Sequence, residues 1–396
     1  MRAALNGIPS YRPDIYSHGA ILDPHPHYRR MRRLGPVVWL PRHRVYALPR
    51  YAECKATLRD DETFGSSEAV ALNPISNRLS CGTTLASDGT EHAARRRHVA
   101  HRLLPRALRS IGETVDDTAA AVVDAALERG TVDAVDHLAT ALPLAIVPDL
   151  VGWPRDQREH LIAWGGATFD MLGPLNWRAV KAVPRTWQML RFARRVVRQR
   201  TVIEGSITHE LLAVADDGML SHDELPALMV DYIAPSLDTT ISAISNALYL
   251  LGTHPEQWAQ LKNDPTLIPG AINEVVRLES PLRAFARRVR TDTELGGVTL
   301  PAGSRVLVQY ASANRDESEW DAPDAFDIRR DAVRQLGFGH GAHACAGQGL
   351  ARLETTAMLH ALLDRVDRIE VTGDPVWAAN NIIHRHEHLP VTLHPA

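Results

Sequence analysis

The segment from Leu336 to Leu363 holds the densest group of reactive side chains in the chain. Cys345 is followed at once by a helical pattern, and a thiolate at a helix N-terminus is stabilised by the helix dipole and by free backbone N–H groups. The cysteine is surrounded by two histidines and five glycines, namely His340, His343 and glycines 337, 339, 341, 347 and 349. This composition predicts a loop that can approach a flat ligand closely and donate hydrogen bonds to the sulfur.

Several interpretations of this loop remain open from the residues alone. The letters "GFGHGA" fit a loose dinucleotide-binding loop, but the preceding "DAVRQL" is a poor strand and no βαβ alternation follows. His340, His343 and Cys345 could bind zinc, but no second ligand pair of recognised spacing occurs elsewhere. Cys345 could ligate a haem iron as a thiolate. The plain alternative is a buried, inert cysteine.

A second chemical feature interrupts a long apolar helix. Apolar residues recur at helical spacing from Leu225 to Leu248, yet Pro235, Ser236, Asp238 and Thr239 lie in the middle. A proline there removes a backbone hydrogen bond at a cost of roughly 3 kcal/mol. The acid and the hydroxyl compete for backbone hydrogen bonds at the weakened point, and taken alone they are read as side chains satisfied within the helix.

The cysteine loop resembles one family closely. "FGHGAHACAG", Phe338 to Gly347, matches the F-G-x-G-x-H-x-C-x-G signature of the cytochrome P-450 haem-thiolate monooxygenases at every fixed position. The resemblance extends over nearly the whole chain. It implies haem b with Cys345 as the axial thiolate, Phe338 and His343 beside it, and a mainly α fold with a small segregated β part that encloses the haem as one domain, residues 1–396.

Two further motifs fit the same family. "NEVVRLESP" places Glu274 and Arg277 three residues apart on one helix face, like the family's E-x-x-R pair, and Arg330 is the expected third member of that buried ion network. The haem propionates are expected to contact cations, which are His92, Arg96, Arg287 and His343. The neighbouring arginines 95, 97, 288 and 290 are expected to be solvated surface charges.

In the family the long central helix crosses the distal side of the haem. The resemblance implies that Thr239 holds a water beside bound dioxygen and that Asp238 relays protons from solvent. The family's Ala-Gly before this pair is replaced by Pro235-Ser236. We therefore predict that the proline opens the helix in place of the glycine, and that Ser236 adds a hydroxyl to the water network.

Four segments are expected to face the substrate: residues 70–85, residues 165–177, "PLRAFA" and residues 380–384. The predicted contacts are Asp231, Ala234, Phe285, Phe169 and Ile382. The amino-terminal half resembles soluble bacterial members that oxidise para-substituted benzoic acids, and Arg78, Ser76 and Ser80 could bind such a carboxylate. Asp231 would repel it, so we expect a neutral aromatic or terpenoid-like substrate of small to medium size that is hydroxylated or O-demethylated.

The elements that position these residues follow from the rest of the sequence. The 396 residues carry a net charge of −3, contain three cysteines and show no linker or repeat. This composition predicts a reduced, cytoplasmic protein without a disulfide framework, a membrane span or a nucleic-acid footprint. A monomer is expected. Residues 61–85 are expected to form a long irregular segment, and strands are expected mainly near the carboxyl end.

The family further implies external partners. Dioxygen is the co-substrate, and a ferredoxin with its reductase is expected to supply electrons, because no flavin or iron–sulfur domain is fused. Arg95, Arg97 and Arg102 could bind such an acidic partner, or form an ordinary solvated face. A peroxide-driven or coupling-type haem-thiolate enzyme and a haem-based sensor or carrier remain alternatives.

Overall fold

The structure, a computed structural model, describes residues 7–396, apart from the side chains of residues 105 and 234. The predicted substrate contact Ala234 therefore lies outside the described side chains. The α-helices are α1 His18–Leu22, α2 His25–Leu34, α3 Tyr51–Arg59, α4 Pro74–Leu79, α5 Gly89–Ala100, α6 Pro105–Leu108, α7 Gly112–Arg129, α8 Ala141–Val151, α9 Leu161–Leu172, α10 Trp177–Gln199, α11 Ile207–Asp216, α12 Leu225–Thr253, α13 Pro255–Asn263, α14 Ile268–Leu278, α15 Tyr310–Ala313 and α16 Gln348–Arg365.

The strands form four small sheets. A five-stranded sheet has the order β1-β2-β8-β5-β3, in which only β2 and β8 pair in parallel. The other sheets are β4-β12-β9 and the two-stranded pairs β6-β7 and β10-β11. The strands are β1 Val38–Leu40, β2 Val45–Leu48, β3 Phe64–Gly65, β4 Thr131–Asp133, β5 Phe285–Val289, β6 Thr293–Leu295, β7 Val298–Leu300, β8 Arg305–Val308, β9 Val366–Val371, β10 Val376–Trp377, β11 His386–His388 and β12 Pro390–Pro395.

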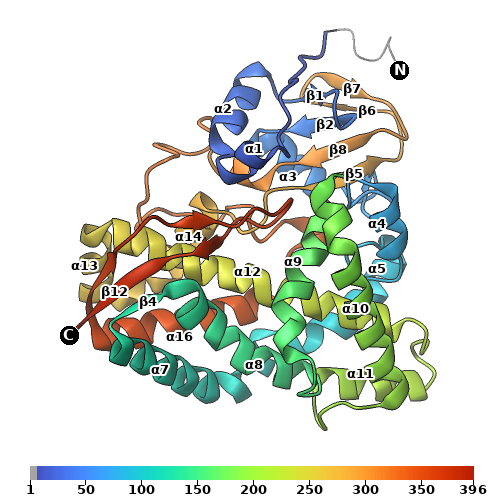
Figure 1. Cartoon of the computed structure of the whole chain (residues 1–396). Coiled ribbons are helices and arrows are strands. Elements are labelled where there is room, and N and C mark those ends of the chain that lie inside the picture. Colours follow the sequence, from blue (N-terminus) through green and yellow to red (C-terminus); the bar gives the residue numbers. More distant parts are fainter. Residues whose placement is uncertain (1–6) are drawn as a thin grey trace.

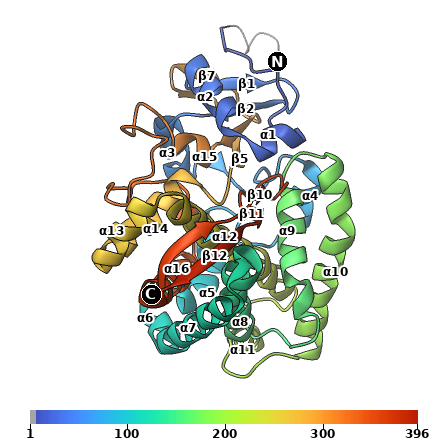
Figure 2. The ribbon, with the colours of Figure 1, turned by 60° about the vertical axis from the view of Figure 1, so that its left-hand side comes forward.

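Helix α12 runs through the middle of the helical part (Figure 1) and contacts helices α8, α9, α10, α14 and α16. Its apolar stripe is buried because neighbours cover it on several sides, as expected for a helix that is apolar over most of its surface. The five-stranded sheet lies at one end of the molecule with α1, α2 and α3 (Figures 1 and 2). The predicted mainly α architecture with a small segregated β part is confirmed.

One predicted irregular segment contains regular structure. Within residues 61–85 the chain forms β3 and the helix α4, which begins at Pro74 after Asn73 accepts a hydrogen bond from the N–H of Ser76. A helix of six residues is too short to show a periodic pattern, although Asn-Pro is a usual helix start. Among the described residues, no helix combines the length and the apolar character needed to cross a bilayer.

Candidate active site

The cysteine loop is held by tight backbone contacts. Gly339 and Gly341 both adopt φ of 70°, a conformation that favours glycine. A Cβ on Gly341 would lie 2.1 Å from the carbonyl oxygen of Leu58, so no other residue fits there without moving α3. The N–H of Cys345 donates to the carbonyl of Phe338 at 2.8 Å, which closes the loop just before α16.

The Cys345 sulfur lies at the N-terminus of α16, as the sequence predicts. Burial raises the pKa of the thiol, while the N–H groups of Gly347 and Gln348 and the charges of Arg96 and Arg352 oppose that rise. Of the described cysteines only Cys345 borders the large cavity described next. The site therefore offers one thiol, fixed in direction and surrounded by donors and cations that stabilise its thiolate form.

A cavity of about 260 Å³ lies between the cysteine loop, α12, β5 and α9. Apolar side chains dominate its wall, and they come from segments far apart in the chain. Of the predicted site residues it is lined by Cys345, Phe338, His343, Arg96, Arg287, Thr239, Asp231, Phe169 and Phe285. The structure thus brings most of the predicted residues to one space.

The two arginines at this cavity have no carboxylate partner among the described residues, whereas His343 faces Asp88 at 3.8 Å. Arg96 and Arg287 form no ion pair with a described residue, and the guanidinium of Arg287 donates to the carbonyl of Ala286 at 2.9 Å. His92 does not border the cavity; its ring lies behind that of His343, with centroids 4.0 Å apart. Burial, His343 and Arg96 lower the pKa of His92 to about 4. The buried Nε2 atoms of both histidines lack a hydrogen-bond partner.

These features fit a haem group. The two guanidinium groups without an ion pair to a described residue make a positive site that fits anionic groups, as the two propionates would provide. The Nε2 atom of His343 lies 3.8 Å from the Asp88 carboxylate, beyond hydrogen-bond distance, and can serve as a further donor. The glycine-rich loop allows a flat ring to approach the sulfur of Cys345. Haem would therefore be held through Cys345, Arg96, Arg287 and His343, with His92 supporting His343.

Glu274, Arg277 and Arg330 form one ion network behind the cysteine loop. The Arg277 guanidinium donates to both carboxylate oxygens of Glu274, at 2.7 and 2.8 Å, and both side chains are fully buried. Arg277 also donates to the carbonyls of residues 314, 323 and 325, and Arg330 reaches Glu274 at 3.1 Å. The network ties α14 to the loop that leads towards Cys345.

On α12, hydroxyl groups are used by the helix itself. Thr239 lines the cavity and its Oγ1 donates to the carbonyl of Pro235 at 2.6 Å. Ser236 also lines the cavity and donates its hydroxyl to the carbonyl of Tyr232, so its oxygen can still accept a hydrogen bond and its place in a water network stays a prediction. Pro235 has no N–H to donate to the carbonyl of Asp231. Even so, α12 remains helical on both sides of the proline.

Asp238 faces away from the cavity that Thr239 lines. Its carboxylate is buried, and Nε of Arg385 lies 3.3 Å from Oδ1, while neither oxygen has a hydrogen bond within standard geometry. Burial raises the pKa of Asp238 to about 6; Arg385 opposes this rise and Asp170 adds to it. The side chain of Arg385 is 18% exposed, so it connects the buried acid with solvent. The sequence gives no signal for this pair, because 147 residues separate its members.

Asp231 stands in the cavity wall, where the N–H of Thr84 donates to it at 2.7 Å. Burial raises the pKa of this carboxyl to about 6, against the lowering effect of the Thr84 N–H. The predicted contact Ile382 is wrong: Ile382 is buried in the hydrophobic cluster that includes Phe169 and Phe285, and does not border the cavity. Pro281 and Leu282 line the wall instead, and no residue of 380–384 reaches it.

Several arginine predictions need correction. Arg95 is buried and pairs with Glu91 and Glu224 at 2.6 and 3.0 Å, so it is neither a solvated charge nor available to a partner. Arg290 is exposed, as predicted, although it pairs with Asp88 at 2.6 Å; Arg102 pairs with Glu210 at 2.9 Å and is less available to a partner. Of the expected partner patch, Arg97 alone remains exposed and unpaired among the described residues.

Two of the three residues predicted to bind a benzoate carboxylate do not reach the cavity. Arg78 is exposed and lines no part of the cavity. The hydroxyl of Ser76 donates to the carbonyl of Met171 at 2.6 Å, and only Ser80 borders the cavity. The described cavity wall therefore offers an anionic substrate no arginine besides those expected to hold the propionates.

Comparison with known proteins agrees with this site. The sequence profile "Cytochrome P450" matches residues 186–377. Cytochrome P450 CYP199A2 of Rhodopseudomonas palustris is 34% identical over 98% of this chain and 96% of its own. The beta-dihydromenaquinone-9 omega-hydroxylase of Mycobacterium tuberculosis is 30% identical over 96% of this chain and 78% of its own. The solved structure of cytochrome P450 CREJ with (4-ethylphenyl) dihydrogen phosphate has a TM-score of 0.87 at 26% identity, covering 94% and 98% of the two chains.

The chain belongs to the cytochrome P450 family. It is a monooxygenase of the oxidoreductase class, with haem as cofactor and a cysteine thiolate as the iron ligand. The dinucleotide-loop, zinc and inert-cysteine interpretations of the Cys345 loop are thereby set aside.

Proposed function

We propose that this monooxygenase hydroxylates or O-demethylates a neutral, hydrophobic, small to medium-sized aromatic substrate. The observation that carries the proposal is the position of Asp231. It is the only carboxylate among the described residues lining a mainly apolar cavity, and Phe169 and Phe285 stand in the same wall. A buried carboxylate repels an anionic substrate and accepts a hydrogen bond from a hydroxyl or an amine.

The residues of the site are assigned roles within this proposal. Cys345 is the iron ligand, and when bound, the haem supplies the activation of dioxygen. The cations Arg96, Arg287 and His343 hold the propionates and fix the ring. Thr239 positions a water at the cavity wall. Asp238 takes protons from solvent beside Arg385 and delivers them towards that water.

The relatives support an aromatic substrate without deciding its charge. The CREJ structure contains (4-ethylphenyl) dihydrogen phosphate, which carries an aromatic ring, and another relative is named a beta-dihydromenaquinone-9 omega-hydroxylase. The phosphate ester in the CREJ structure is anionic, so the charge of the substrate is the part of the proposal that most needs a test.

The test is a titration of the haem spin state with matched ligand pairs. We expect neutral aryl ethers to shift iron from low to high spin and the corresponding benzoates to do so weakly. Asp231→Asn should improve benzoate affinity by about tenfold at pH 8, because a charge repulsion worth roughly 1.4 kcal/mol is removed. Near pH 5, below the Asp231 pKa of about 6, the wild type and the variant should converge. A strong shift by benzoates alone in the wild type would overturn the proposal.

We further propose that a monomer in the cytoplasm receives its electrons from a ferredoxin and its reductase. Turnover with ferredoxin, compared with turnover on added peroxide, separates this from a peroxide-driven or coupling-type enzyme. A haem sensor or carrier would show neither activity.

A further inference from the structure

Helix α10 has a charge unlike that of the rest of the chain. Its 23 residues, Trp177–Gln199, include seven cations and no acidic residue, while the whole chain has a net charge of −3. The cations are Arg178, Lys181, Arg185, Arg191, Arg194, Arg195 and Arg198. Such an asymmetry indicates an anionic partner rather than a requirement of the fold.

The outward face of α10 is also apolar over half its length. Seven exposed residues are separated in turn by three and four positions, so they lie on one side of the helix and form one stripe. They are Trp177, Val180, Pro184, Trp187, Arg191, Arg194 and Arg198. The two tryptophans are 68% and 47% exposed. The opposite face of α10 packs against the rest of the protein, so the stripe is a second apolar surface in addition to the face that the fold buries. Figures 1 and 2 both show α10 at the outer edge of the molecule.

The arginines of this stripe are not neutralised within the protein. Arg191, Arg194 and Arg198 form no ion pair with any described residue, whereas Arg195, which lies outside the stripe, pairs with Asp156 at 2.8 Å. Lys181 lies over the ring of Trp177 at 5.4 Å, which places a cation beside the most exposed aromatic side chain. Aromatic anchors next to arginine and lysine are typical of helices that lie in a membrane interface.

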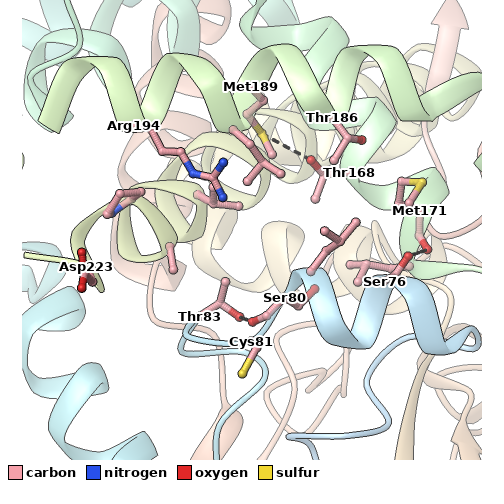
Figure 3. Close-up of a pocket in the computed structure, with 16 residues that line it drawn as sticks. Ser76, Ser80, Cys81, Thr83, Thr168, Met171, Thr186, Met189, Arg194 and Asp223 are labelled. Carbon is pink, nitrogen blue, oxygen red and sulfur yellow. Dashed lines mark hydrogen bonds between the residues drawn. The ribbon is translucent and has the colours of Figure 1, made fainter. Parts of the chain in front are cut away.

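The stripe borders an entrance. A second cavity of about 200 Å³ is lined by residues of α4, α9, α10 and α12, and it shares five lining residues with the cavity at Cys345: Ser80, Thr83, Thr168, Leu172 and Val230. Leu79 and Arg194 on its wall are exposed, so the cavity reaches the surface there. Figure 3 shows the guanidinium of Arg194 directed from α10 into the cavity. Ile75 and Leu79 of α4 add exposed apolar area.

We propose that α10 docks this protein on an anionic lipid surface, so that hydrophobic substrates pass from the bilayer into the second cavity. This is peripheral binding, without a segment that crosses the bilayer, and it goes beyond the proposed function. A helix at the outer edge of the molecule fits a flat surface, and the unpaired arginines are complementary to anionic head groups. The tryptophans and Val180 would enter the head-group region.

The experiment is co-sedimentation of the holoenzyme with vesicles. One set contains phosphatidylglycerol and phosphatidylcholine, the other phosphatidylcholine alone. We expect binding only to the anionic vesicles, with loss at high salt. The double variant Arg191→Glu, Arg198→Glu should lose on the order of 25-fold in affinity, because each cation near the surface contributes roughly fivefold.

A matched control makes the same change in net charge elsewhere. Arg12 and Arg30 are exposed, and their replacement by Glu should leave vesicle binding within about twofold. Brominated acyl chains should quench tryptophan fluorescence in the wild type but much less in the variant Trp177→Phe, Trp187→Phe. Binding is measured without turnover, so its failure is distinct from failure of the proposed function.

Three results would overturn the proposal. One is equal binding to both vesicle types, and another is equal loss of binding in the control variant. The third is a stable dimer in solution that dissociates when Trp177 and Trp187 are replaced, which would show that a second copy covers the stripe.

Discussion

The cysteine loop and the middle of α12 border the same cavity, but they relate to their sequences differently. The loop matches its family signature at every fixed position, and its backbone explains why: Gly341 has no room for a side chain against Leu58. The middle of α12 departs from the family by placing Pro235-Ser236 before Asp238-Thr239. Even so, the helix is continuous and Thr239 reaches the cavity.

The difference shows what each region has to fix. The loop must hold one sulfur atom in a set direction, and a turn with two residues in the left-handed region tolerates almost no substitution. The helix must present a hydroxyl and weaken one backbone turn, which either a glycine or a proline can do. Variants in the two regions should therefore fail in different ways.

The largest effect is expected in the loop. Cys345→Ala should abolish monooxygenase turnover and the red-shifted absorption band of the reduced carbon monoxide complex, because the thiolate ligand is lost. Cys81→Ala is the matched control, since Cys81 is exposed and does not border the cavity at Cys345. A Cys345→Ala protein that keeps the band would show that another residue ligates the iron.

The second-largest effect is expected in the ion network behind the loop. Arg277→Leu leaves Glu274 as a buried charge whose chief partner is lost, and we expect a loss of about 3–5 kcal/mol in the free energy of unfolding. Arg365→Leu removes a partly exposed ion pair with Asp124 at 2.7 Å and should cost less than about 1 kcal/mol. Denaturant unfolding of both variants measures the contrast. Equal losses would mean that the buried network does not support the loop.

On the helix side, Asp238→Asn should lower turnover by about 10²-fold or more, because a proton donor is lost without a change of shape. The acid form delivers the proton, so wild-type turnover should fall as pH rises through the Asp238 pKa of about 6. Arg385→Met removes the cation that lowers this pKa, so the fall should move to higher pH. The control Arg368→Met, an exposed arginine of β9, should leave the pH profile in place. An unchanged profile in Arg385→Met would remove Arg385 from the proton route.

These contrasts also show how far the sequence could be read. The loop, the Glu274 network and the course of α12 were predictable because each depends on residues close in the chain or on a long periodic pattern. The pair of Asp238 and Arg385 was not, and neither was the burial of Arg95, because Glu224 approaches it from a distant segment. Ile382 was misplaced because Asn380 accepts hydrogen bonds from the N–H groups of Ile382 and Ile383, a local turn that the apolar letters do not reveal.

The smallest expected effect is the one that separates the two regions most directly. Pro235→Ala would supply the N–H that the carbonyl of Asp231 lacks, so we expect a more stable helix, by at most about 3 kcal/mol. If the proline opens the helix for oxygen, product formed per reductant should fall several-fold. Pro184→Ala, in the interior of α10 and away from the cavity at Cys345, should bring a similar gain in stability with no change in yield. Unchanged oxygen affinity, turnover and yield in Pro235→Ala would mean that Pro235 has no role in oxygen activation and that α12 tolerates its proline as α10 tolerates Pro184.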